Sequence, residues 1–125
     1  MKFEKGTEII WQDRKRRLGL PLSFYRYYLV KKEGEWVKLF RHKGFFTSIL
    51  DEINCYRLLD VSLIQTVGDK IFKTGTIRIL SNDASAPLFH LRHIKHPFEV
   101  RNLVSNTMEA ERRKRNVAIT ELQGK

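Results

Sequence analysis

Hydrophobic and polar residues alternate along the middle of the chain, which is the pattern of β-strands with one buried face. Tyr25, Tyr27 and Leu29 occupy alternate positions in the first of these runs. A charged turn that contains glycine follows over residues 31–35, and residues 36–40 form a predicted return strand. Aromatic residues on both sides of a glycine turn favour a β-hairpin.

The alternation continues beyond this hairpin and predicts further short strands joined by tight turns. Acidic residues at 51–52 predict a bend, and the polar segment over residues 67–70 predicts a loop. Leu59, Val61 and Leu63 are expected to share one buried face. The further strands are predicted over residues 45–50, 59–63, 75–80 and 88–94.

The period of the pattern changes after the last predicted strand. Pro97 suits the first position of a helix, and Glu99 suits the positive end of its dipole. The apolar residues that follow recur at helical spacing and form one stripe. This stripe consists of Val100, Leu103, Val104, Thr107 and Met108. The pattern predicts an amphipathic helix over residues 97–115.

These elements define a mainly β fold of the α+β class. We expect a curved antiparallel sheet or partly open barrel of about seven strands, capped by one C-terminal α-helix. The chain has 125 residues, 42% of them hydrophobic, which suits a single domain with its own core. The predicted parts are an N-terminal extension (1–20), the strands (22–94), the helix (97–115) and a tail (116–125).

Three motifs follow one another in the second half of the chain. They are Asp51-Glu52-Ile53 with Tyr56-Arg57, Asp60-Val61-Ser62-Leu63 and Gln65-Thr66; then Asp69-Lys70-Ile71-Phe72 leading into Gly75-Thr76-Ile77; and finally Ile94-Lys95-His96-Pro97 with Glu99-Val100-Arg101. As an ordered set they resemble the motifs of bacterial pleckstrin-homology-like domains. The resemblance extends from Tyr25 to Met108.

This resemblance implies a pleckstrin-homology-like scaffold whose ligand is undefined, because one fold serves many functions. The chain departs from the family pattern at three positions. Lys70 stands where the family typically has arginine, Lys73 where it has glycine, and His96 where it has asparagine. The change at Lys73 bears on the local turn, since glycine adopts positive φ at little cost and lysine does not.

The balance of charge is the first indication of function. The net charge is +10 at pH 7, which favours a polyanionic partner or simply high solubility. The cations gather in two basic runs and in the first predicted hairpin, where Glu33 and Glu35 oppose anion binding. The candidate anion-binding or partner-binding residues are Arg14, Lys15, Arg16, Arg17, Lys31, Lys32, Lys38, Arg41, Arg112, Arg113, Lys114 and Arg115.

The pattern predicts no enzyme and no cofactor. Cys55 lacks a neighbouring base in any known nucleophile motif, and phosphate-binding glycine loops are missing from the sequence. His90, His93 and His96 are spaced by three, which places them on diverging directions of a strand or helix, so no metal site is expected. With one cysteine and no long apolar run, the expected setting is cytoplasmic.

We therefore expect a non-catalytic binding or assembly module. Its expected partners are another protein or a second copy of the chain, and then an anionic membrane surface, with the module peripheral to the inner membrane. A basic nucleic-acid-binding protein is the alternative, although the sequence has no readout motif for bases. No small-molecule substrate is expected.

Overall fold

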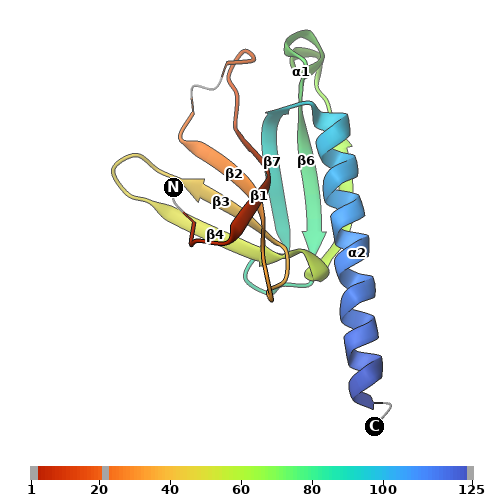
Figure 1. Cartoon of the computed structure of the whole chain (residues 1–125). Coiled ribbons are helices and arrows are strands. Elements are labelled where there is room, and N and C mark those ends of the chain that lie inside the picture. Colours follow the sequence, from red (N-terminus) through yellow and green to blue (C-terminus); the bar gives the residue numbers. More distant parts are fainter. Residues whose placement is uncertain (1–2, 21–22, 124–125) are drawn as a thin grey trace.

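A computed structural model describes residues 3–20 and 23–123 of the chain. These residues form seven β-strands, one short 3₁₀ helix and two α-helices (Figure 1). In chain order the elements are β1 (Thr7–Arg14), β2 (Tyr25–Lys32), β3 (Lys38–Lys43), β4 (Ile49–Asn54), η1 (Cys55–Arg57), β5 (Leu58–Ile64), α1 (Val67–Phe72), β6 (Thr74–Ser81), β7 (Leu88–Lys95) and α2 (Pro97–Gln123).

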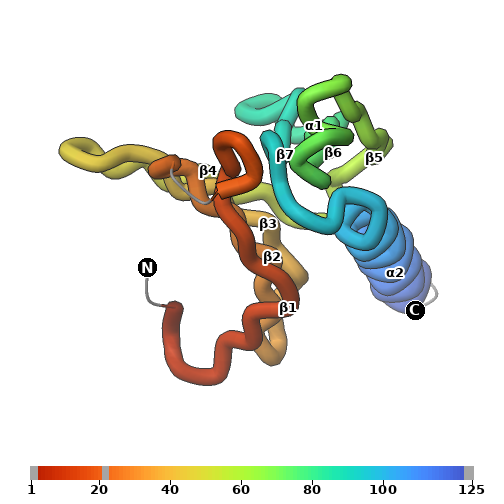
Figure 2. The backbone as a smooth tube through the Cα atoms, turned by 90° about the horizontal axis from the view of Figure 1, so that it is seen from above, coloured from red at the N-terminus to blue at the C-terminus, as the bar shows by residue number. Residues whose placement is uncertain are grey.

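The strands form two antiparallel sheets, one with the order β1-β2-β3-β4 and the other with the order β5-β6-β7. Helix α2 packs against β5, β6 and η1, so it covers the second sheet (Figure 2). This confirms the predicted fold class, an antiparallel pleckstrin-homology-like arrangement of strands with one helix at the C-terminal end. Within the described residues the two sheets do not close into a barrel.

The main core lies between the two sheets and α2. Tyr27 and Leu29 of β2 point into it and are fully buried, as their alternate spacing predicts. Val100, Val104 and Met108 present the buried stripe of α2 to the same core. Their spacing of four residues places them on one face of the helix, which confirms the predicted stripe.

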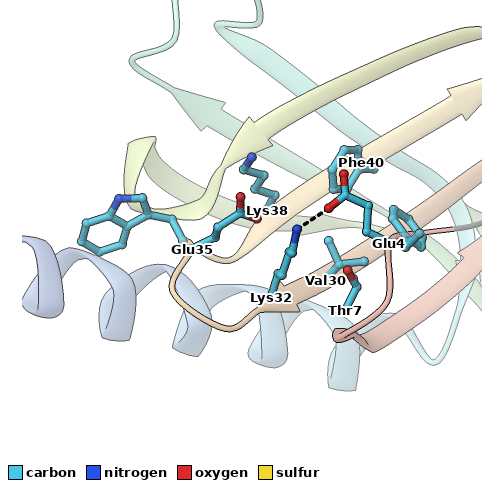
Figure 3. A pocket seen from close by; sticks show the side chains of 9 residues that line it. Glu4, Thr7, Val30, Lys32, Glu35, Lys38 and Phe40 are labelled. Carbon is cyan, nitrogen blue, oxygen red and sulfur yellow. Dashed lines mark hydrogen bonds and ion pairs between the residues drawn. The ribbon is translucent and has the colours of Figure 1, made fainter.

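A second, smaller apolar cluster lies on the other face of the first sheet. Tyr28, Val30 and Phe40 are buried there, and Phe3 packs over them. The ring of Phe3 lies 5.3 Å from that of Tyr28, in an edge-on arrangement. The cluster borders a shallow cavity of about 210 Å³ (Figure 3). The N-terminal segment therefore covers apolar surface that a free sheet face would expose.

The N-terminal twenty residues are not only an extension. They contain β1, which pairs along its length with β2. This strand is not predicted from the sequence, because Ile9, Ile10 and Trp11 are consecutive apolar residues without a clear period. The register with β2 shifts between Ile9 and Trp11, so a bulge interrupts the alternation there.

The strand predicted over residues 45–50 is wrong in its position. The chain turns over residues 44–48 and β4 begins at Ile49, so residues 51–52 lie within a strand and not in a bend. Gly44 makes this turn possible at a φ of +118°. A Cβ atom at Gly44 would lie 1.6 Å from the carbonyl oxygen of Thr47, so only glycine fits.

Three further expectations also need correction. The loop predicted over residues 67–70 is part of α1, and α2 continues through most of the predicted tail to Gln123. Leu59 is half exposed because the register between β5 and β6 shifts between Leu58 and Asp60, so Leu58 faces the core instead. The predicted start of the strands at residue 22 lies outside the described residues.

Candidate functional site

The β1–β2 connection lies between the β3–β4 turn on one side and α1 on the other (Figure 1). Tyr25 pairs with Lys43, so the β1–β2 and β3–β4 connections leave the first sheet at the same end. The amide of Arg16 donates a hydrogen bond to the carbonyl oxygen of His93 at 3.0 Å, which brings the β1–β2 connection to the second sheet. We call this surface the loop end, defined as residues 15–20, 23–24, 43–49 and 67–73.

Phenylalanine side chains are exposed on the β3–β4 turn of the loop end. Phe46 is 96% exposed and Phe45 is 66% exposed. The rings of Phe45 and Phe46 lie 4.7 Å apart, and Phe24 stacks on Phe45 at 4.8 Å. Three aromatic rings therefore form one apolar projection on a turn, where soluble domains normally place polar residues.

The β1–β2 connection provides a second apolar projection. Arg17 and Leu20 exchange two backbone hydrogen bonds, at 2.9 and 2.8 Å, and so close a tight two-residue turn. Leu18 occupies this turn at a φ of 50° and is 73% exposed. A left-handed conformation is costly for leucine, and strain of this kind concentrates at functional sites.

Cations surround these apolar residues. Lys15, Arg17 and Lys43 border the aromatic projection, and Lys70 and Lys73 lie on and beside α1. The ammonium of Lys15 lies 5.3 Å from the ring centre of Tyr25. The segments of the loop end contain one carboxylate, Asp69, and it is buried. The exposed charge of the loop end is therefore positive.

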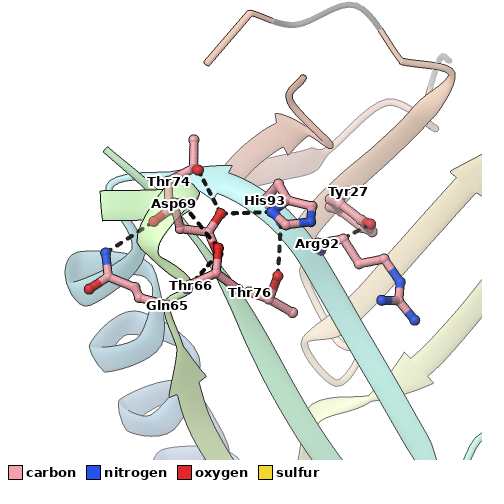
Figure 4. Close-up of polar contacts among 8 residues, drawn as sticks. All are labelled: Tyr27, Gln65, Thr66, Asp69, Thr74, Thr76, Arg92 and His93. Carbon is pink, nitrogen blue, oxygen red and sulfur yellow. Dashed lines mark hydrogen bonds and ion pairs between the residues drawn. The ribbon is translucent and has the colours of Figure 1, made fainter. Parts of the chain in front are cut away.

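Asp69 organises the base of the loop end (Figure 4). Its Oδ2 atom accepts hydrogen bonds from the amide and the hydroxyl of Thr66, each at 3.0 Å, and this capping box starts α1. Its Oδ1 atom accepts from the hydroxyl of Thr74 at 2.8 Å and lies 2.7 Å from Nδ1 of His93. Asp69 thus joins α1, β6 and β7.

These contacts set the ionisation of Asp69. Burial alone raises the pKa of this carboxyl group, but the hydrogen bonds from Thr66, His93 and Thr74 outweigh it and lower the pKa to about 2. Asp69 is therefore charged at neutral pH despite being only 4% exposed. His93 itself adopts a φ of 47°, and the hydroxyl of Thr76 accepts a hydrogen bond from its amide at 3.2 Å.

The structure separates the two basic runs that the sequence predicts. Arg14 ends β1, and Lys15, Arg16 and Arg17 lie at the loop end. The second run, Arg112 to Arg115, lies on α2 beside the β2–β3 turn and η1, at the end of β2 opposite to the loop end. Since they lie at opposite ends, the two runs do not form a single basic surface.

The cations of the first predicted hairpin also lie away from the loop end. Lys31 is exposed near the end of β2, Lys32 forms an ion pair with Glu4, and Lys38 begins β3 (Figure 3). Arg41 binds Oδ2 of Asp51 through two nitrogens, at 2.7 and 3.1 Å. Its guanidinium also lies 4.6 Å from the ring centre of Phe89, which gives Arg41 a structural role.

The second basic run packs partly on aromatic rings. Lys114 lies 5.5 Å from the ring centre of Trp36, and Arg115 lies 4.8 Å from that of Tyr56. Lys114 also forms an ion pair with the buried carboxylate of Glu111 at 3.7 Å. Arg112 and Arg113 are exposed. Half of this run therefore fixes α2 against the β2–β3 turn and η1.

The aromatic projection and the Asp69–His93 pair are not predicted from the sequence. The residues 45–46 looked like the interior of a strand, because two adjacent phenylalanines favour β-structure. Thr66 and Asp69 do have a sequence signal, since a threonine followed three residues later by an acidic residue marks a helix start. His93 has no such sequence signal, because its partner Asp69 lies 24 residues away in the chain.

The described residues contain no cluster of three histidine, cysteine or acidic side chains that could hold a metal ion. Across the same residues, none of the helices combines the length and the apolar character needed to cross a bilayer. No family model, curated protein or solved structure matches this chain. A function is therefore inferred from the fold and from the geometry of the loop end.

Proposed function

We propose that this domain is a peripheral binding module that docks on anionic membrane surfaces through its loop end. The observation that carries the proposal is the exposed pair Phe45 and Phe46 on a turn bordered by Lys15, Arg17 and Lys43. Aromatic side chains that insert between headgroups, together with cations that bind anionic lipids, are the two components of interfacial binding.

The magnitudes suit reversible binding. Burial of two phenylalanine side chains contributes about 4 kcal/mol, at about 2 kcal/mol each. Lys15, Arg17 and Lys43 add about 3 kcal/mol at an anionic leaflet. The gross sum of about 7 kcal/mol corresponds to a dissociation constant of about 10 μM, before ordering costs. Neither component alone would hold the domain at a membrane.

The sequence favours a protein partner or a second copy of the chain, with a nucleic acid as the alternative. Each would bury the same apolar projection or cover the same cations. Binding to a nucleic acid would leave exposed aliphatic side chains such as Leu18 and Leu20 without an apolar partner. A bilayer accommodates all of these residues at once, because apolar side chains enter the acyl boundary while cations stay at the headgroups.

The test is co-sedimentation with vesicles of phosphatidylcholine, with and without phosphatidylglycerol, at low and at physiological salt. The wild-type chain is expected to bind the anionic vesicles, and more weakly as salt rises, because the electrostatic component is screened. Replacing both phenylalanines (Phe45→Ser with Phe46→Ser) should weaken binding at least about tenfold, from the lost burial.

Matched variants at the opposite end provide the control. Leu122→Ser removes another exposed apolar side chain, and Lys31→Glu reverses a cation outside the loop end. Both should bind like the wild type, whereas Lys43→Glu should bind more weakly. The proposal is contradicted if the variant with both phenylalanines replaced binds anionic vesicles as tightly as the wild type. It is also contradicted if light scattering without lipid shows self-association of the wild type that this variant has lost.

A further inference from the structure

A groove of about 590 Å³ opens at the loop end between the β1–β2 turn and α1. This volume is in the range of sites for small organic ligands. Leu18, Leu20 and Phe72 form its apolar wall. Lys15, Arg16 and Arg17 line it as well, and His93 with Asp69 lies at its base. The groove is thus apolar along one wall and cationic along another.

The cationic wall is partly prepared for an anion. The guanidinium of Arg16 is held by Oδ1 of Asp13 at 3.0 Å and by the carbonyl oxygen of Gly19 at 3.2 Å. Its Nε atom is buried and has no hydrogen-bond partner among the described residues. The contacts with Asp13 and Gly19 hold this guanidinium in a fixed position along the groove. Arg17 stands exposed at the rim.

The imidazole of His93 is held in place at the base of the groove. Nδ1 of the ring faces Asp69, so Nε2 is the nitrogen left for a ligand. In the imidazolium form Nδ1–H donates to Asp69 and Nε2–H donates to an anion, and the charges of the Asp69–His93 pair then cancel, so that Asp69 repels the anion little. The ring therefore adds a third polar group that an anion can reach.

We infer that this groove binds the phosphate monoester of an anionic amphiphile, with the phosphate between Arg17 and His93 and the apolar part along Leu18, Leu20 and Phe72. A phosphate monoester carries close to two charges and three terminal oxygens, which suits several cationic donors better than a carboxylate does. This inference rests on the proposed function, because a membrane is the source that presents such amphiphiles to the loop end.

Short-chain lipids that stay in solution test binding in this groove independently of membrane docking. The probes are dihexanoyl phosphatidate, dihexanoyl phosphatidylcholine and inorganic phosphate, each added below micelle-forming concentrations to the ¹⁵N-labelled chain. Phosphatidate is expected to shift amide signals of residues 15–20, 66–74 and 93, and phosphatidylcholine is expected to shift none of them. Inorganic phosphate should bind at least about tenfold more weakly, since it makes no apolar contact.

Two variants test where in the groove the phosphate binds. Arg17→Gln should weaken phosphatidate binding about tenfold through loss of one charge-assisted hydrogen bond. His93→Asn should weaken it similarly, and asparagine tolerates the left-handed backbone at this position. Arg113→Gln, at the opposite end, is the matched control and should bind like the wild type. Wild-type affinity in both groove variants, or shifts confined to other residues, would overturn the site.

Failure of the site and failure of membrane docking give different results. If the variant with both phenylalanines replaced binds soluble phosphatidate normally but no longer binds vesicles, both proposals stand. If the wild-type chain binds phosphatidylglycerol vesicles but not soluble phosphatidate, docking stands and the phosphate site is wrong. Equal affinity for inorganic phosphate and phosphatidate would overturn the role of the apolar wall.

Discussion

Nδ1 of His93 lies 2.7 Å from Oδ1 of Asp69, across 24 residues of sequence. The contact links the last strand of the second sheet to the helix that begins at the loop end. Asp69 is buried and also binds Thr66 and Thr74, so one carboxylate fixes three elements. The arrangement positions His93 at the base of the groove, and it also makes the stability of the fold depend on pH.

The first prediction concerns acid stability. The folded state holds Asp69 at a pKa of about 2, below the ordinary value of 3.8. Its contribution to the free energy of unfolding is therefore complete above pH 3.8 and is lost as the pH falls towards 2. Asp69→Asn should lower the stability at neutral pH by about 2 kcal/mol and flatten the pH dependence in this window.

Urea unfolding at neutral pH and at several acid pH values measures both effects. Glu52→Gln, at an exposed position of β4, is the control and should leave the stability and its pH dependence close to those of the wild type. If Asp69→Asn kept the wild-type slope between pH 3.8 and 2, Asp69 would not be the group that titrates there.

A second prediction concerns Lys73. This residue ends α1 in the left-handed conformation, at a φ of 58°. Glycine adopts that conformation without the steric cost that lysine bears. Lys73→Gly should therefore raise the free energy of unfolding by about 1 kcal/mol. The matched control is Lys70→Gly inside the same helix, which should lower it by about 1 kcal/mol. Two changes of the same sign would refute the argument.

A third prediction concerns Cys55. Burial raises the pKa of its thiol to about 12, and the charge of Glu111 adds to the effect. The thiolate is the reactive form, so the folded protein should react very slowly with an aromatic disulfide reagent at neutral pH. A cysteine introduced by Ser85→Cys on an exposed turn should react at once. Rapid reaction of Cys55 in the native protein would mean that the core opens locally.

The fourth prediction concerns the end of α2. Val117 and Leu122 are exposed, and the last buried side chains of the helix are Met108 and Glu111. Deletion of residues 117–125 should reduce the helical signal in circular dichroism but change the free energy of unfolding by less than about 0.5 kcal/mol. Deletion from Met108 onwards removes buried contacts and should destabilise the domain strongly. A large loss from the shorter deletion would show that this segment has a packing role.

Local periodicity accounts for most of the elements that were predicted correctly. The alternation at Tyr25, Tyr27 and Leu29 and the stripe at Val100, Val104 and Met108 depend on neighbours in sequence, so the pattern alone indicates which face is buried. The errors occur where local chemistry departs from a regular period. A bulge placed Leu58 instead of Leu59 in the core, and the turn at Gly44 moved the next strand by four residues.

The sequence by itself determined the class of the fold, the terminal helix and an excess of positive charge, because each follows from composition or from contacts close along the chain. Only the tertiary structure decided where on the surface that positive charge lies. Strand pairing brought Lys15, Lys43 and Phe45 to one end, placed the run at Arg112 at the other, and set His93 against Asp69. Contacts of this kind depend on how distant strands pair in three dimensions, and no local pattern encodes them.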